Sequence, residues 1–222
     1  MPRRAPPITP AVVRGIAGLA WVQGHLDVAF GILIGFHCMI RGCEVLRLKF
    51  CDCMHFGNTT VLDLGFTKTG SRKGTREQVT VTDSSLTNLF RYFCRDCSSS
   101  EHLVCMSPCN FRKYFSRFLS FFSLGNEGFT LHSLRRGGAT HFFRVTGHLS
   151  ATVERGRWLS VSSGRLYINE GMSILAHRKI RPATATALRI AAEALPCKSA
   201  IQNTVSDHHM HSKGGESSAN CG

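Results

Sequence analysis

The sequence predicts a mainly helical domain with one small antiparallel β-sheet, an α+β fold. Apolar residues recur at helical spacing over most of the chain, and a single segment, residues 59–83, has β-strand character. With 222 residues, of which 43% are hydrophobic, the chain can bury one sizeable core. We therefore expect one globular domain with short additional segments.

Composition divides the chain into three parts. Residues 1–11 are expected to form an extended lead-in, because four of the seven prolines fall within the first ten positions. Residues 12–196 carry the helical and β-prone patterns and are expected to form the folded domain, the catalytic one if the chain is an enzyme. Residues 197–222 are rich in Ser, Asn, Gly and His, a composition that predicts disorder.

Helices are expected wherever apolar residues repeat every three or four positions. The first two patterns, at 12–19 and 26–40, predict a helix pair whose second member is buried. Further patterns cover 84–94, 110–122, 137–145, 161–177 and 183–195. Gly137 and Gly138 are expected to turn the backbone tightly after Arg135 and to bring the N-terminus of the next helix close to it.

The β-prone run reads TTVLDLGFTKTGSRKGTREQVTVTD, residues 59–83. Two strand-like segments flank a centre rich in Gly and Lys, which predicts a hairpin with an exposed loop. Lys68 lies at the edge of that loop.

The charge balance favours a polyanionic partner. Lys and Arg number 27 against 14 Asp and Glu, giving a formal net charge of +13 and a pI of about 9.7. Charges beyond residue 196 cancel, so the whole surplus belongs to residues 1–196. Because such an excess binds polyanions through counterion release, nucleic acid is the first candidate partner.

The ten cysteines are interpreted as reduced thiols, because MPRRAPPITP lacks the apolar stretch of a secretory signal. The most apolar run, Val28 to Ile40, is too short to span a bilayer, so no membrane anchor is expected. Two cysteine pairs admit a zinc site by their spacing; they are Cys94 with Cys97 and Cys105 with Cys109. The segment between the pairs has the character of a buried connector, and structural cysteines are the favoured interpretation.

Five short motifs contain the residue types that bind and attack a phosphodiester. In chain order they are IRGCEVLRL, TKTG, HSLRRGGAT, GRWLS and RLYI. They contain Arg41 and Glu44, then Lys68, then His132 and Arg135, then Trp158 and finally Tyr167. Arg135 precedes Trp158 by 23 residues, and Trp158 precedes Tyr167 by nine. Each motif alone is weak evidence, but in this order and spacing they resemble the tyrosine recombinases, the family of the phage integrases.

The chemistry of these residues can be stated without the family. Attack on a DNA phosphodiester builds negative charge on the non-bridging oxygens, so a site needs fixed donors there. Arg41 and Arg135 suit this role because a guanidinium stays protonated and can bond two phosphate oxygens at once. His132 and the indole N–H of Trp158 would add donors. Glu44, three residues after Arg41, would orient its guanidinium.

Tyr167 is the candidate nucleophile. Its phenol, whose ordinary pKa is about 10, must lose a proton during attack, and His132 is the candidate to assist that loss. The departing 5′ oxygen needs a proton, which a lysine on a hairpin loop can deliver. Lys68 is the candidate general acid, with Lys73 as the alternative.

The resemblance implies DNA strand cleavage and rejoining, in site-specific recombination or integration, through a 3′-phosphotyrosyl intermediate. It implies a double-stranded DNA partner, a homo-oligomer on DNA in the form of a tetrameric synapse, and no nucleotide or metal cofactor. The protein is then expected inside the cell with DNA, in the nucleus if the host is eukaryotic.

Two other functions stay open. Members of the family carry a helical domain before the catalytic one, and here about a dozen residues precede the first expected helix. A DNA-binding relic of a mobile element, without recombination activity, is therefore one alternative. Relaxation of supercoils by the same chemistry, as in type IB topoisomerases, is another. Residues 180–195 are expected either to dock on a neighbouring protomer or to pack within the chain.

Overall fold

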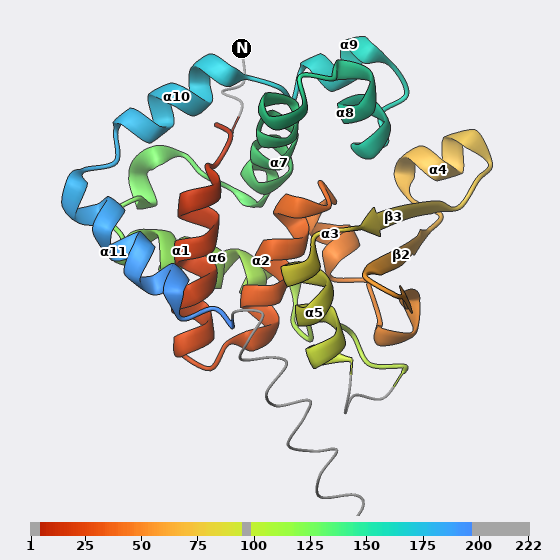
Figure 1. The fold of residues 1–222 in the computed structure, drawn as a ribbon, viewed down its shortest axis with the longest axis horizontal. Helices are drawn as coiled ribbons and strands as arrows, with labels where there is room; N and C mark the ends of the chain where they lie inside the picture. The colour runs from red at the N-terminus through yellow and green to blue at the C-terminus, as the bar shows by residue number, and fades with distance from the viewer. Residues whose placement is uncertain (1–4, 95–98, 197–222) are drawn as a thin grey trace, which may run out of the picture.

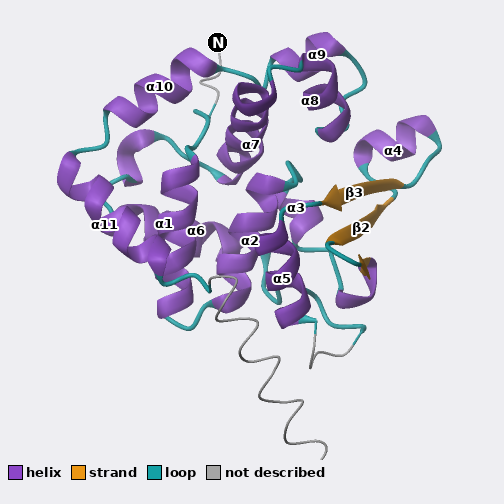
Figure 2. Cartoon of the chain, in the orientation of Figure 1, coloured by secondary structure: helices purple, strands orange, loops and turns teal. Residues whose placement is uncertain are grey.

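The protein is described by a computed structural model covering residues 5–94 and 99–196. It is mainly helical, with a small antiparallel sheet at one edge, as predicted (Figures 1 and 2). The helices are α1 Pro10–Val22, α2 Leu26–His37, α3 Gly42–Val45, α4 Lys68–Lys73, α5 Ser84–Phe93, α6 Pro108–Phe121, α7 Leu131–Thr146, α8 Leu149–Arg155, α9 Val161–Arg165, α10 Glu170–Arg178 and α11 Pro182–Glu193. The strands are β1 Cys53–Phe56, β2 Thr59–Gly65 and β3 Glu77–Val81. None of the helices in these ranges is long and apolar enough to cross a membrane.

Helix α2 forms the centre of the core. Every residue from Val28 to Phe36 is buried, which confirms the expected buried second helix. Helix α1 packs along it, and α6 adds an aromatic stripe of Phe111, Phe115 and Phe118. These apolar faces stabilise the fold by removing hydrocarbon from water.

The sheet has the strand order β1-β2-β3, with both pairs antiparallel. The predicted hairpin corresponds to β2 and β3, paired through Leu62 and Val79. Its connection contains the short helix α4, so Lys68 is the first residue of a helix rather than part of an irregular loop. Strand β1 was not expected, because its four residues are too few to show a periodicity.

Helix α7 begins earlier than expected, and this overturns one prediction. The helix starts at Leu131, where Thr130 caps it by accepting a hydrogen bond from the backbone N–H of His132 at 3.2 Å. Gly137 and Gly138 therefore lie in mid-helix and make no turn after Arg135. A Cβ on Gly137 would lie 2.1 Å from the carbonyl oxygen of Ile8, so these glycines serve close packing against neighbouring backbone.

The single helix expected over 161–177 is also wrong. It is interrupted between α9 and α10, where Asn169 caps α10 by accepting from the backbone N–H of Met172 at 2.9 Å. Tyr167 lies in the connection between the two helices. Its apolar neighbours suggested one continuous helix, but the capping asparagine starts a new one.

Helix α11 packs within the chain, on α1, as one of the two expectations for residues 180–195 had it (Figure 1). Leu188 is buried against Gly15, and Gly18 faces the backbone of Ala191. Side chains larger than hydrogen at either glycine would collide with α11, so the two helices approach closely. The tail predicted to be disordered, 197–222, lies outside the described residues.

Candidate active site

Arg135 lies at the centre of the candidate site. Its side chain is 1% exposed, and its guanidinium donates from Nη1 to the carbonyl of Met39 at 2.5 Å and from Nη2 to that of Gly156 at 2.6 Å. Burial, followed by repulsion from Arg157 and Arg41, lowers the pKa of Arg135 to about 10, so it stays protonated at neutral pH. Two fixed carbonyls thus hold a cation in one orientation.

Two aromatic rings cover this guanidinium. The centre of the Arg135 guanidinium lies 4.9 Å from the Trp158 ring and 5.5 Å from the Tyr167 ring. The two rings are themselves 4.7 Å apart, at 35°. The indole Nε1 of Trp158 is buried and has no hydrogen-bond acceptor among the described residues. A buried N–H without a partner is rare in folded proteins, and a phosphate oxygen would satisfy it.

The segment that carries Tyr167 is tied to α7 through its backbone. Thr140 donates from Oγ1 to the carbonyl of Tyr167 at 3.3 Å and accepts from the N–H of Asn169 at 3.2 Å. Because Thr140 is on the same helix as Arg135, these two bonds fix the tyrosine segment relative to the guanidinium.

His132 lies one turn before Arg135 on α7, at the surface of the site. Its ring centroid is 5.3 Å from that of Tyr167. Burial, followed by the charges of Arg135, Arg136 and Arg41, lowers the pKa of His132. The imidazole is therefore neutral at neutral pH and able to accept a proton.

Arg41 reaches the group from a different element. It precedes α3 rather than lying in a helix, because α2 ends at His37. The carboxylate of Glu44 accepts from Arg41 twice, from Nη1 at 2.5 Å and from the backbone N–H at 2.8 Å, which is the orienting contact expected between them. The positive charge of Arg41 lowers the pKa of both His132 and Arg135, so Arg41 is close enough to act on them electrostatically.

Lys68 is not brought into this cluster. It is exposed at the start of α4, at the outer end of the β2–β3 hairpin (Figure 1). Among the described contacts, none joins it to Arg135 or Tyr167. The alternative acid, Lys73, is the last residue of α4.

Arg157 is a buried cation that the sequence analysis missed. Its side chain is 7% exposed and bridges two carboxylates, Glu44 at 2.9 Å through Nη2 and Glu77 at 3.1 Å through Nε. Its backbone has a φ of 56°, in the left-handed region that non-glycine residues seldom adopt. Arg157 is the second residue of the motif GRWLS, but its partners Glu44 and Glu77 lie far away in the sequence.

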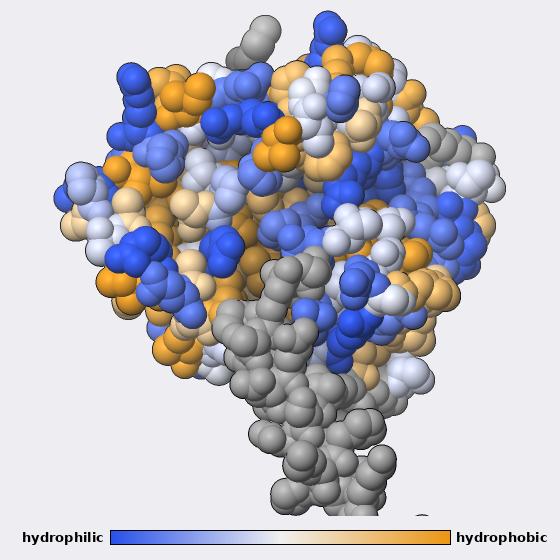
Figure 3. Space-filling model, in the orientation of Figure 1, coloured by the Kyte–Doolittle hydropathy of each residue, from blue (hydrophilic) through white to orange (hydrophobic). Residues whose placement is uncertain are grey.

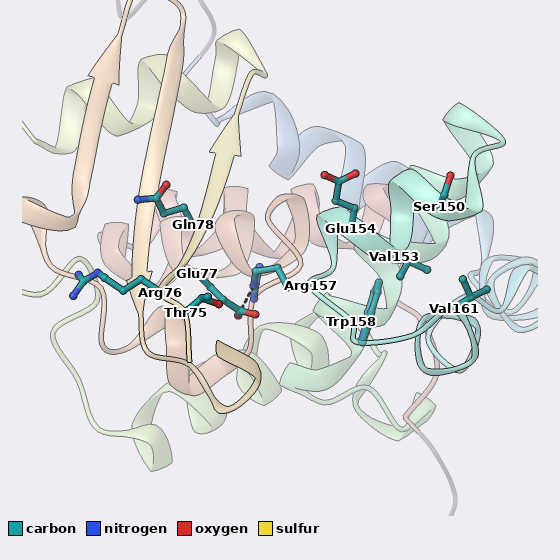
Figure 4. Close-up of a pocket in the computed structure, with 10 residues that line it drawn as sticks. All are labelled: Thr75, Arg76, Glu77, Gln78, Ser150, Val153, Glu154, Arg157, Trp158 and Val161. Carbon is teal, nitrogen blue, oxygen red and sulfur yellow. Dashed lines mark hydrogen bonds and ion pairs between the residues drawn. The ribbon is translucent and has the colours of Figure 1, made fainter. Parts of the chain in front are cut away.

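A cleft of about 490 Å³ opens beside Arg157. It lies between β3 and the part of the chain formed by α8 and α9, called the α8–α9 lobe below. Figure 4 shows Arg157 and Glu77 pointing toward one another, with Trp158 beside them. Arg76, Gln78 and Glu154 are exposed along it. On the face shown in Figure 3, hydrophilic side chains gather between the α8–α9 lobe and the hairpin.

The structure describes three of the four cysteines considered as zinc ligands, Cys94, Cys105 and Cys109. Cys97 lies outside the described residues, and Cys105 and Cys109 are both exposed. Within residues 5–94 and 99–196, no group of three or more His, Cys, Asp or Glu side chains is arranged to hold a metal ion.

Comparison with known proteins shows the fold. No family model and no curated protein matches the sequence. A structure of the XerH site-specific recombinase bound to difH substrate, a pre-cleavage complex, matches with a TM-score of 0.60 and 16% identity over 81% of this chain and 56% of that chain. Its post-cleavage complex with a palindromic difH substrate matches with a TM-score of 0.56 and 17% identity over 74% and 50%. XerA recombinase matches with a TM-score of 0.54 and 14% identity over 82% and 66%. The chain thus spans about half to two thirds of these recombinases.

Proposed function

From a fold shared with tyrosine recombinase catalytic domains, we propose that this chain cleaves and rejoins DNA strands through Tyr167. One observation carries the proposal: Arg135, Trp158 and Tyr167 lie within 5.5 Å of one another by ring and guanidinium centres. His132 lies against the same phenol. A nucleophile, a neutral base and fixed cationic donors in one place constitute what attack on a phosphodiester requires.

In the proposed reaction, the phenolic oxygen of Tyr167 attacks the scissile phosphorus. The bond from phosphorus to that oxygen forms as the bond to the 5′ oxygen breaks. His132 accepts the phenolic proton, and Lys68 donates a proton to the departing oxygen. Rejoining reverses these steps when a 5′-hydroxyl attacks the phosphotyrosine.

In the proposed reaction, the cationic groups and the indole act on the phosphate. Arg135 and Arg41 stabilise the charge that grows on the non-bridging oxygens, and the free indole N–H of Trp158 adds a hydrogen bond. In the free protein Lys68 is exposed and no described contact joins it to Arg135 or Tyr167, so its role as general acid requires the hairpin to approach them when DNA binds. Hairpin movement on binding is therefore part of the proposal.

Double-stranded DNA is the proposed partner for two reasons. The surplus of 13 positive charges favours a polyanion, and the XerH structures are complexes with difH substrate. Assembly as a homo-oligomer on DNA and membership of a mobile element stay predictions.

The test is a search for the covalent intermediate without assuming a target sequence. The 222-residue chain is incubated with duplexes whose central 40 or so base pairs are randomised and nicked, a span that exceeds the site sizes typical of DNA-binding modules. Protein-linked DNA is then isolated under denaturing conditions and sequenced. We expect an adduct with the wild-type protein and with Tyr92→Phe, an exposed tyrosine used as the matched control, and none with Tyr167→Phe.

Failure to find a Tyr167-dependent adduct on any sequence defeats the proposal. Salt-dependent DNA binding without an adduct then favours the inactive relic, for which the isolated position of Lys68 is the supporting observation. Plasmid relaxation that depends on Tyr167 but yields no joint products favours the topoisomerase-like reaction.

A further inference from the structure

We infer that Arg157 is a positioning residue that connects two parts of the proposed active site. One part is Arg41 with its carboxylate partner, and the other is the β2–β3 hairpin that carries Lys68. This inference rests on the proposed function. Arg157 touches neither Arg41 nor Lys68 in the described contacts. It acts through one carboxylate on each side, Glu44 and Glu77.

The first connection runs through Glu44. The carboxylate of Glu44 is 2% exposed and receives Arg157 on Oε2 and Arg41 on Oε1. Burial alone would raise the pKa of Glu44, but Arg157, the strongest opposing influence, and Arg41 together hold it below its ordinary value. Glu44 thus stays ionised, and an ionised carboxylate is what orients the Arg41 guanidinium.

The second connection runs through Glu77 on β3. Its Oε2 accepts from Arg157 and also from the hydroxyl of Thr67 at 2.5 Å. The same Thr67 hydroxyl accepts from the N–H of Gly70 at 3.1 Å, and the Thr67 carbonyl accepts from Ser71 at 2.8 Å. Thr67 therefore caps α4, and its next residue is Lys68.

One guanidinium is needed for both carboxylates. Glu44 and Glu77 come from different elements, and both are buried where an uncompensated charge is costly. Arginine can bond two acceptors at fixed angles through Nε and Nη2, whereas lysine offers a single ammonium.

The contact between Arg157 and Glu77 joins the two sides of the cleft described above. The hydrogen bond from Arg157 to Glu77 crosses from the segment after α8 to β3, beside an open space of about 490 Å³ (Figure 4). We expect this hydrogen bond to hold the start of β3 in place while the connection between β2 and β3 stays able to approach DNA.

The experiment compares two leaving groups on a sequence recovered from the adduct search. One duplex has an ordinary scissile phosphodiester, and the other has sulfur in place of the bridging 5′ oxygen. A thiolate leaves without a proton, so loss of a general acid is rescued by the sulfur substrate, whereas a general loss of folding is not. The variants are Lys68→Ala, Thr67→Val and Arg157→Lys, with Thr80→Val as a control of the same shape change at an exposed position of the same sheet.

We expect Thr67→Val and Arg157→Lys to slow cleavage of ordinary DNA by roughly tenfold to a hundredfold, as misplacement of a catalytic group does. Both are expected to follow Lys68→Ala in being rescued by sulfur, and Thr80→Val to match the wild type. Equal loss on both substrates, or no loss, overturns the inference. If Arg157→Lys does not fold, Thr67→Val decides.

A second measurement does not depend on cleavage. Hydrogen exchange of residues 67–75 in the DNA-free protein should be faster in Arg157→Lys and Thr67→Val than in Thr80→Val. Unchanged exchange overturns the inference even if the adduct forms. Faster exchange in a protein that never forms an adduct supports the connection through Arg157 and rejects the proposed function.

Discussion

The imidazole of His132 lies against the phenol of Tyr167, with ring centroids 5.3 Å apart. The two residues come from α7 and from the connection between α9 and α10. Partial burial of the imidazole, followed by the charges of Arg135, Arg136 and Arg41, lowers the pKa of His132 and favours its neutral form. The contact therefore predicts how the reaction depends on pH.

The rate of adduct formation should fall in acid with a midpoint below pH 6.5, the ordinary pKa of histidine, because the pKa of His132 is lowered in the fold. The base is neutral and active above its pKa, and activity is lost as the pH falls through it. Single-turnover rates between about pH 5 and pH 8, the range in which histidine titrates, measure this. His148→Gln, at an exposed histidine, should keep the profile, and His132→Gln should lower the rate and remove the inflection. A midpoint above pH 6.5 contradicts the assignment.

Arg135 should matter for folding as well as for chemistry. In Arg135→Lys a single ammonium cannot reach the carbonyls of both Met39 and Gly156, so a buried acceptor loses its partner. We expect the free energy of unfolding to fall by about 3 kcal/mol, measured by urea denaturation. Arg144→Lys, on an exposed part of the same helix, should change it little. Equal stability of the two variants would show that these bonds contribute nothing to folding.

Gly156 should not tolerate a side chain. A Cβ at this position would lie 1.8 Å from Cζ3 of Trp158, so Gly156→Ala must displace the indole or the backbone. A loss of about 1–3 kcal/mol in unfolding free energy and a changed tryptophan emission are expected. Gly171→Ala, where the nearest atom is 3.9 Å away, is the control and should leave both unchanged or slightly improve stability.

The docking of α11 should depend on Leu188. This side chain is 1% exposed against α1, whereas Ile190 on the same helix is 57% exposed. Leu188→Ala should lower the unfolding free energy by about 2–5 kcal/mol or release α11 to proteases, because it leaves a cavity at a close helix contact. Ile190→Ala should stay within about 0.5 kcal/mol of the wild type. Similar effects of the two variants would mean that α11 does not pack on α1 in solution.

The helices were predicted well where one apolar face is continuous. The apolar run over residues 26–40 correctly predicted a buried helix. The helix ends at His37, three residues earlier than the apolar run, because an apolar pattern does not show where the backbone leaves the helix. The start of α7 at Leu131 and the interruption between α9 and α10 were missed for a different reason. They are set by capping side chains, Thr130 and Asn169, that compete locally with the apolar pattern.

The sequence revealed the candidate site only in part, because it marks residues that belong to local motifs and not those defined by distant partners. Arg135, Trp158 and Tyr167 belong to short motifs that can be recognised along the chain, and the structure brings them together. Arg157 has no such mark of its own. Its importance depends on Glu44 and Glu77, which precede it by 113 and 80 residues, and only the fold brings them within hydrogen-bond distance.

The sequence by itself determined the class of fold, the sign of the charge and the residue types available for phosphodiester chemistry. These follow from apolar periodicity and composition, which are local properties of the chain. The tertiary structure decided which side chains converge, that Lys68 stays outside the cluster in the free protein, and that one buried guanidinium is shared by two carboxylates. Such relationships depend on distances between segments remote in sequence, and those distances are set by the packing of the whole core.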